Sequence, residues 1–321
     1  MPAKPSAAFL DFATLGPGVD TVRLDEVVDA RYFDFSEADE IPARLDGCEV
    51  ALLNKTKIDR GLIESAGGLK LIVVAATGLD NIDADAANEA GVAVANVRDY
   101  CSDAVAQHVF ALILGLTQQI GPYAERVREG AWSQSRSFAL FDFPIRELAG
   151  LKLGIVGYGS LGRAVARIGE AFGMTVLVSG RVGCDASDAP DRVPFDVLLE
   201  EADVLSLHCP LNDATRHMLE ATAFRRMKRD AIVVNTARGS LIDQEALAEA
   251  LRNGEIGGAA VDVLPEEPPS PDAPLLAPDI PNLIVTPHIA WAAREARQRV
   301  IDQVAENVAS FYAGGDLRRI V

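Results

Sequence analysis

Gly157-Tyr158-Gly159-Ser160-Leu161-Gly162 lies near the middle of this 321-residue chain and directly follows the apolar run from Leu151 to Val156. The residues after it, 164–168, have the pattern of an amphipathic helix. A strand, a tight glycine turn and a helix in this order are typical of a dinucleotide-binding site. The stretch therefore predicts a nucleotide-binding α/β unit. Its central position requires another unit in about the first 150 residues.

The three glycines of this turn have separate physical roles. Gly157 allows the tight turn, Gly159 lets the backbone approach a pyrophosphate, and Gly162 lets the helix pack close to the strand. The helix is expected to begin near Ser160. Its unpaired N–H groups and the positive end of its dipole would then face the pyrophosphate.

Composition narrows the class of protein. The length fits two domains, and 49% hydrophobic with only 6% aromatic residues fits a layered α/β core. A net charge of −17 argues against nucleic acid and anionic membranes as partners. No signal peptide or membrane-length apolar run is seen, so we expect a soluble, cytoplasmic protein. The scattered cysteines are interpreted as free thiols: Cys48, Cys101, Cys184 and Cys209.

Short β-like runs alternate with helical stretches along the first hundred residues, which indicates a parallel sheet covered on both faces. The expected strands are 7–11, 49–53, 69–75 and 92–95, and the expected helices are 59–66 and 83–89. Asp83 is expected to cap the second of these helices. A long helix should begin at Ser102 and end at Gly121-Pro122.

The second half repeats this alternation. Six parallel strands are expected at 153–156, 175–179, 204–208, 231–235, 258–263 and 283–286. Seven prolines between Pro265 and Pro281 predict a loop. The last helix, about 292–313, is expected to pack on the first domain and make it discontinuous. The predicted domains are 1–100 with 290–321, and 101–289.

Three polar residues follow expected strands on the edge where ligands bind in such sheets: Arg238, Glu267 and His288. Together they suit reduction of a 2-keto acid. An arginine can bind a carboxylate and stabilise the developing oxyanion, and a histidine can supply the proton. A carboxylate beside that histidine orients the ring. Each residue also has a simpler explanation: a surface arginine at a turn, a charge in an acidic loop, or a packed histidine.

The chain resembles the D-isomer-specific 2-hydroxyacid dehydrogenase family over nearly its whole length. The matching stretches are 153–162, Leu207-His208-Cys209-Pro210-Leu211, Val234-Asn235-Thr236-Ala237-Arg238-Gly239, Asp262-Val263 with Glu267-Pro268, and Thr286-Pro287-His288. The resemblance implies that Arg238 binds substrate, that His288 is the acid/base and that Glu267 is its partner. It also implies a flavodoxin-like, discontinuous substrate domain, a cleft between the domains, and a homodimer.

Within the family the chain is most similar to the glycerate dehydrogenases, or hydroxypyruvate reductases. This similarity rests on Asn96-Val97-Arg98-Asp99-Tyr100, Val105-Ala106-Gln107-His108-Val109, Phe141-Asp142-Phe143-Pro144-Ile145 and His288-Ile289-Ala290-Trp291. It implies reduction of hydroxypyruvate, and of glyoxylate, to the 2-hydroxy acid. The candidate cofactor contacts are Gly157, Gly159, Ser160, Leu161, Gly162, Ser179, Gly180, Arg181, Cys209, Pro210, Thr236, Asp262 and Val105. The candidate substrate contacts are Asn54, Thr77, Gly78, Arg238, His288 and Trp291.

Two of these substrate contacts also follow from the residues themselves, and one has an equal alternative. Thr77 and Gly78 follow an expected strand, where the backbone offers unpaired N–H donors for a carboxylate. Trp291 either forms a wall of the pocket or lies exposed or at an interface.

The cofactor motif departs from its usual pattern at one point. A site that prefers NAD(H) usually has an acidic residue at the end of the second strand, where it binds the ribose 2′-hydroxyl. This chain has Ser179-Gly180-Arg181 there, and Asp185 lies too far along. Arg181 with Ser179 can instead bind a 2′-phosphate, so we predict use of NADP(H), although NAD(H) still binds if Arg181 only points to solvent.

A nucleotide-sensing binding protein is the main alternative to a 2-keto acid reductase. A nucleotide-sensing corepressor on the same fold would also retain Arg238, Glu267 and His288. No Tyr-x-x-x-Lys of short-chain dehydrogenases and no P-loop motif is present. The remaining histidines are interpreted as packed or interfacial (His108), structural (His208) and solvated (His217). None has a metal-ligand partner at helical spacing, so no catalytic metal is predicted.

Overall fold

Two parallel sheets form the frame of the protein. The computed structural model describes residues 3–181 and 191–321, so Cys184 and Asp185 lie outside the described residues. The chain divides into unit 1, Met1–Cys101 with Ala292–Val321, and unit 2, Ser102–Trp291. These limits differ by one or two residues from the predicted boundaries.

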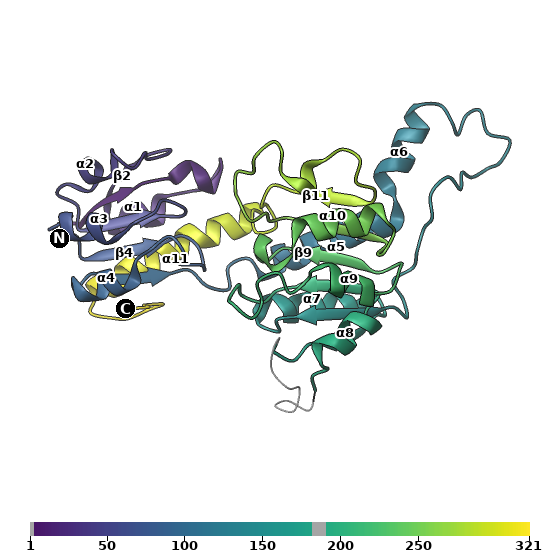
Figure 1. Ribbon diagram of the computed structural model, residues 1–321. Helices are drawn as coiled ribbons and strands as arrows, with labels where there is room; N and C mark the ends of the chain where they lie inside the picture. The colour runs from purple at the N-terminus through teal and green to yellow at the C-terminus, as the bar shows by residue number, and fades with distance from the viewer. Residues whose placement is uncertain (1–2, 182–190) are drawn as a thin grey trace. The chain divides into compact units, whose positions relative to one another are not determined.

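Unit 1 is a five-stranded parallel sheet with helices around it (Figure 1). Its elements are β1 Ser6–Phe9, η1 Phe12–Leu15, α1 Val22–Val27, β2 Asp29–Tyr32, α2 Ile41–Leu45, β3 Val50–Leu53, α3 Arg60–Ser65, β4 Leu71–Val74, α4 Ala84–Glu89, β5 Ala93–Asn96 and α11 Arg294–Tyr312. The strand order β2-β1-β3-β4-β5 is that of flavodoxin-like folds, which confirms the expected fold class of this domain. Helix α11 packs on α1, β4 and β5, which makes unit 1 discontinuous.

Burial explains which strands of unit 1 could be predicted. Every residue of β3, β4 and β5 is buried, because helices cover both faces of a parallel sheet, and such strands read as continuous apolar runs. Strand β2 was missed. It is an edge strand whose exposed Asp29 and Arg31 alternate with half-buried residues. The predicted cap of α4 is confirmed, since the Asp83 carboxylate accepts from the Ala86 N–H at 2.8 Å.

Unit 2 contains a six-stranded parallel sheet in the order β11-β10-β9-β8-β6-β7. Its elements are α5 Ser102–Gln118, α6 Ile120–Arg128, β6 Lys152–Val156, α7 Ser160–Ala171, β7 Thr175–Val178, α8 Phe195–Glu201, β8 Val204–Leu207, α9 Ala221–Arg226, β9 Ile232–Asn235, η3 Gly239–Leu241, α10 Gln244–Arg252, β10 Gly258–Val261, η4 Pro274–Leu276 and β11 Leu283–Val285. The six predicted strands are confirmed. The strand order reverses between β6 and β8, and this switch point is where doubly wound sheets bind ligands.

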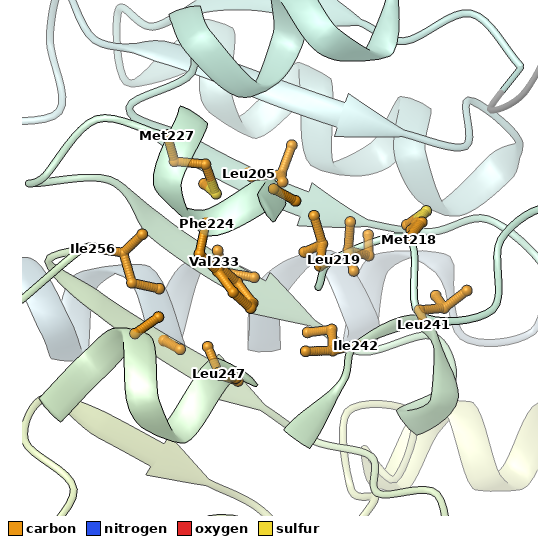
Figure 2. Packing of buried hydrophobic residues seen from close by; sticks show 14 of the residues in the cluster. Leu205, Met218, Leu219, Phe224, Met227, Val233, Leu241, Ile242, Leu247 and Ile256 are labelled. Carbon is orange, nitrogen blue, oxygen red and sulfur yellow. The ribbon is translucent and has the colours of Figure 1, made fainter. Parts of the chain in front are cut away.

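Aliphatic side chains from strands and helices fill the interior on one side of this sheet. Figure 2 shows part of the cluster, with Phe224 of α9 beside Val233 of β9 and with Leu247 of α10 and Leu205 of β8 nearby. Phe224 and Val233 are fully buried. This rigid layer supports the strand ends that carry the candidate site.

The predicted end of the long helix was wrong. Helix α5 ends at Gln118, where Gln119 takes a left-handed conformation (φ 53°), and α6 follows at once. Gly121 and Pro122 lie inside the first turn of α6. A proline is tolerated there because the first N–H groups of a helix have no intrahelical acceptor.

No single described helix is long and apolar enough to cross a membrane. Helices α5 and α6 pass such a test only as a pair bent by 54°, by length and composition alone. Several side chains of α5, including Val109 and Ile113, are fully buried, so this helix is packed within unit 2.

Candidate active site

The candidate residues of unit 2 follow the strands of one sheet. Because all its strands are parallel, their carboxyl ends lie along the same edge. The glycine turn follows β6, Ser179 to Arg181 follow β7, and Cys209 follows β8. Residues Thr236 and Arg238 follow β9, Asp262 follows β10 directly, and His288 follows β11. The fold thus places these residues along the edge where doubly wound sheets bind dinucleotides.

The glycine turn has the conformation that its sequence predicts. Gly157 has φ +93°, and an added Cβ there would lie 2.5 Å from the backbone nitrogen of Cys209. An added Cβ at Gly162 would lie 2.1 Å from the carbonyl oxygen of Gly157. A Cβ on Gly159 would meet nothing within 4 Å. The chain's own atoms therefore require two of these glycines, and the third leaves open space at the N-terminus of α7.

This open space fits a dinucleotide. Gly159 and Ser160 are exposed, and α7 begins there without a side-chain cap, so its first N–H groups remain for a ligand. A pyrophosphate bound at this terminus would accept from those N–H groups and gain from the helix dipole.

The end of β7 carries the residues that would face the adenosine ribose. Ser179 is buried, and its hydroxyl donates to the Gly180 carbonyl oxygen at 2.8 Å. The Gly180 N–H donates to the carbonyl oxygen of Val193 at 2.9 Å. Arg181 is exposed. No acidic side chain occupies positions 179–181, which agrees with the predicted departure from the NAD(H) pattern.

The turn after β8 lies against the glycine turn. The His208 N–H donates to the Val156 carbonyl oxygen at 2.7 Å, and its Nε2 lies 2.9 Å from the Ser206 hydroxyl. Burial lowers the pKa of His208 to about 4 and raises that of the Cys209 thiol to about 11. Both side chains are therefore neutral near pH 7, which agrees with a structural role for His208.

The turn after β9 presents Arg238. The Asn235 side chain donates to the Arg238 carbonyl oxygen at 2.9 Å and accepts from the Ala237 N–H at 3.0 Å, so it fixes the turn. The exposed Arg238 guanidinium donates to the Ala237 carbonyl oxygen at 2.8 Å. A Cβ on Gly239 would lie 2.0 Å from the carbonyl carbon of Leu264. This close approach brings the Arg238 turn against the loop that carries Glu267.

Glu267 and His288 form a direct pair. His288 Nδ1 lies 2.5 Å from one Glu267 oxygen, and the other oxygen accepts from the Leu264 N–H at 2.9 Å. The side chains are 31% exposed for His288 and 34% for Glu267. An ionised carboxylate can only accept hydrogen bonds, so beside it Nδ1 carries the proton, and Nε2 is the ring nitrogen that Glu267 does not engage.

Asp262 holds the turn on which His288 lies. Its buried carboxylate accepts from the Thr286 hydroxyl at 2.5 Å and from the N–H groups of Ile289 at 2.9 Å and Ala290 at 2.8 Å. Its carbonyl oxygen accepts from the His288 N–H at 2.8 Å. The sequence predicted Asp262 as a cofactor contact and did not predict that its carboxylate holds the His288 turn. Its only signal was an aspartate directly after a buried strand.

His108 of α5 extends this network. Its Nε2 lies 3.2 Å from the Thr286 hydroxyl and 3.6 Å from an Asp262 carboxylate oxygen. The prediction of a packed histidine is consistent with this position.

Val105, another candidate from α5, is buried. The buried Thr236 hydroxyl has no hydrogen-bond partner among the described residues, so a bound ligand could supply one.

The candidate substrate contacts of unit 1 follow two neighbouring strands. Asn54 follows β3 and is buried. Its N–H donates to an Asp11 carboxylate oxygen at 2.8 Å and its amide to the Thr14 hydroxyl at 3.0 Å. Thr77, which is exposed, and Gly78, which is half-buried, follow β4, and the Asn96 side chain donates to the Thr77 carbonyl oxygen at 2.8 Å. The structure thus uses the Asn54 amide internally.

No group of histidine, cysteine and acidic side chains among the described residues could hold a metal ion. Trp291 is half-buried at the end of unit 2. His217 is exposed, as predicted for a solvated residue, and lies in a turn.

Comparisons with known proteins identify the family to which the chain belongs. The family model of the D-isomer specific 2-hydroxyacid dehydrogenase NAD-binding domain matches residues 110–290. The chain belongs to this family. A glycerate dehydrogenase of Methylorubrum extorquens is 45% identical over 86% of each chain. A hydroxypyruvate reductase of Blautia hydrogenotrophica is 33% identical over 95% of this chain and 96% of its own.

A solved structure adds a likeness in three dimensions. An acyclic imino acid reductase in complex with NADPH and D-Arg superimposes with a TM-score of 0.84 at 28% identity, over 98% of this chain and all of its own. The protein is therefore an NAD(P)-dependent oxidoreductase of the 2-hydroxyacid dehydrogenase family, which acts on small keto or hydroxy acids.

Proposed function

We propose that this dehydrogenase reduces hydroxypyruvate to D-glycerate and glyoxylate to glycolate, with His288 as the general acid. The observation that carries the proposal is the 2.5 Å pair of Glu267 and His288 on the sheet edge that carries Arg238. The relatives named glycerate dehydrogenase and hydroxypyruvate reductase support the choice of substrate.

The chemistry follows from the geometry of the three side chains. A bound nicotinamide cofactor supplies the hydride. The guanidinium of Arg238 binds the substrate carboxylate and stabilises the negative charge that develops on the carbonyl oxygen. Protonated His288 donates its Nε2 proton to that oxygen, and Glu267 keeps the ring in position throughout. In the reverse direction neutral His288 accepts the proton from the hydroxyl group.

Thr77 and Gly78 are proposed as further contacts to the substrate carboxylate, because the backbone that follows a strand end offers N–H donors. Asn54 remains a candidate through its position after β3, although its amide is engaged with Thr14. Trp291 is proposed as a wall of the substrate pocket.

NADP(H) use is proposed from the end of β7. Arg181 is exposed there beside Ser179, and positions 179–181 carry no acidic side chain to repel a 2′-phosphate. The related imino acid reductase was determined with NADPH. If Arg181 contributes, Arg181→Ala will lower the NADPH/NADH ratio of kcat/KM, and an unchanged ratio would remove it from the cofactor site.

A homodimer in the cytoplasm is the proposed physical form. No residue of α6 is buried. Apolar side chains are exposed along α6 and the segment after it, which extends away from the sheet of unit 2 (Figure 1): Ile120, Val127, Trp132, Phe138, Phe141 and Ile145. Such a patch is typical of a surface that a second subunit covers.

A substrate panel tests the proposal. Hydroxypyruvate, glyoxylate, pyruvate, 2-ketobutyrate and phenylpyruvate are each assayed with NADH and NADPH, following the nicotinamide absorbance. We expect the highest kcat/KM for hydroxypyruvate. A higher value for another acid would place the protein elsewhere in the family, and no turnover with any acid would favour the corepressor alternative.

A further inference from the structure

Two arginines lie over one tyrosine of the glycine turn. The guanidinium carbon of Arg163 is 4.6 Å from the ring centroid of Tyr158, and that of Arg192 is 4.8 Å from it. Arg163 is in the first turns of α7, whereas Arg192 lies shortly before α8. The dinucleotide motif itself does not require either arginine or an aromatic ring at position 158.

Backbone pairing fixes Arg192 beside the end of β7. Val193 pairs with Ser179 in a parallel bridge, and its N–H donates to the Val178 carbonyl oxygen at 2.9 Å. The Gly180 N–H donates back to the Val193 carbonyl oxygen at 2.9 Å. Arg192 therefore lies next to the strand end that also carries Arg181. Its guanidinium reaches from there to the glycine turn.

Among the described residues, no carboxylate neutralises either of these two arginines. Arg163 and Arg192 form no ion pair with a carboxylate in the ranges 3–181 and 191–321, although the chain carries a net charge of −17. The π system of the Tyr158 ring attracts each guanidinium group, so both positive charges lie beside the glycine turn. A bound anion would be attracted by both charges and would accept hydrogen bonds from the guanidinium group that it reaches.

We propose that Arg192, held on the ring of Tyr158, binds the 2′-phosphate of NADP(H) together with Arg181, and that Arg163 adds to the positive potential there. This inference rests on the proposed use of NADP(H). The end of the second strand is where a doubly wound sheet places the adenosine ribose, so a 2′-phosphate at that ribose would lie between the β7 end and the glycine turn. Arg192 thus determines the specificity for NADP(H) over NAD(H), although it lies outside the glycine motif at 157–162.

Ligand fragments test this site without catalysis. Calorimetry on the full-length protein gives Kd values for 2′,5′-ADP and for 5′-AMP, which differ by the 2′-phosphate. We expect the wild type to bind 2′,5′-ADP more tightly, and Arg192→Ala to weaken that binding by about tenfold or more with little change for 5′-AMP. Tyr158→Phe keeps the ring and should resemble the wild type. Tyr158→Leu removes the ring and should weaken 2′,5′-ADP binding selectively.

Matched variants separate charge from fold. Arg167→Ala removes another exposed arginine of α7, whose guanidinium lies 3.7 Å from the Asp103 carboxylate. This variant should change neither the Kd of 2′,5′-ADP nor that of 5′-AMP. Arg192→Lys retains a charge and should recover part of the loss. Equal weakening of both ligands, or no effect in Arg192→Ala, would overturn the role of Arg192.

The same data distinguish two failures. If the wild type shows no preference for 2′,5′-ADP, both this inference and the proposed use of NADP(H) are wrong. If the preference exists but survives Arg192→Ala, only this inference is wrong. The choice of keto acid does not enter either result, because no substrate is present.

Discussion

The carbonyl oxygen of Asp262 accepts a hydrogen bond from the backbone N–H of His288 at 2.8 Å, while the carboxylate of the same residue binds the two N–H groups that follow. His288 lies in a left-handed conformation with φ +55°, which residues other than glycine rarely adopt. Asp262 therefore acts as the clamp that keeps the candidate acid/base in this conformation.

Asp262→Asn should lower both stability and turnover. An amide NH₂ replaces one accepting oxygen, so a buried donor faces another donor, which costs about 1–3 kcal/mol of unfolding free energy. The loosened turn should reduce kcat by about tenfold or more. Asp243→Asn is the matched control, because Asp243 caps α10 by accepting from the Ala246 N–H at 3.1 Å. It should cost little stability, because asparagine caps a helix about as well as aspartate does, and it should leave kcat unchanged. Equal kcat in both variants would contradict the clamp.

His288→Asn should separate chemistry from cofactor binding. Asparagine cannot donate a proton near pH 7, so kcat should fall by about a hundredfold or more. The Kd of NADPH, measured by quenching of protein fluorescence, should stay close to the wild-type value because the glycine turn is untouched. Retained kcat would exclude His288 as the proton donor.

Two alanine variants of the glycine turn should fail in different ways. Gly162→Ala places a methyl group 2.1 Å from the Gly157 carbonyl oxygen, so the protein should lose several kcal/mol of stability or not fold. Gly159→Ala meets no atom within 4 Å, so its Tm should match the wild type. Its methyl group would enter the open space at α7, and the Kd for dinucleotide should rise by about tenfold or more. Unchanged dinucleotide binding by Gly159→Ala would contradict the proposed position of the pyrophosphate.

His208 should make the protein sensitive to acid. Its pKa is about 4 in the folded state, because of burial, and 6.5 as the ordinary value of the unfolded chain. Between these values the unfolded state binds the proton and the folded state does not, so stability rises with pH and is lost as pH falls from 6.5 to 4. The loss approaches about 3 kcal/mol, at 1.4 kcal/mol for each pH unit.

Denaturant titrations from pH 7.5 to 4 measure this slope. His208→Gln should remove most of it in that window, whereas the exposed His217→Gln should leave it unchanged. An identical slope in wild type and His208→Gln would mean that other groups cause the acid sensitivity.

The exposed aromatics after α6 should hold the dimer together. Phe138 is 89% exposed and Phe141 is 83% exposed. Changing both to serine should convert the dimer to a monomer, as light scattering during gel filtration would show, because the buried apolar area would be lost. Phe35→Ser removes a phenylalanine that is 65% exposed in unit 1 and should leave the mass unchanged. A wild-type monomer would contradict the proposal.

Local sequence was sufficient for much of the fold. Buried strands such as β4 and β9 are continuous apolar runs in the sequence. In the glycine turn of unit 2, nearby backbone atoms leave no room for a Cβ at Gly157 or Gly162, so the glycines themselves predict the turn. Edge strand β2 was missed because its alternating pattern contains charged residues. The end of α5 was misplaced because a proline can stand in the first turn of the next helix.

The sequence by itself determined the parallel architecture and the dinucleotide fingerprint, since each depends on residues close together in the chain. It predicted Arg238, Glu267 and His288 only through the position of each after a strand. Only the tertiary structure revealed the contacts between distant segments. The 2.5 Å pair of Glu267 and His288, the clamp of Asp262 and the approach of Arg192 to Tyr158 join residues that lie 21, 27 or more positions apart. Such contacts arise from the order of strands in the sheet and from the packing of their turns, and no local pattern encodes them.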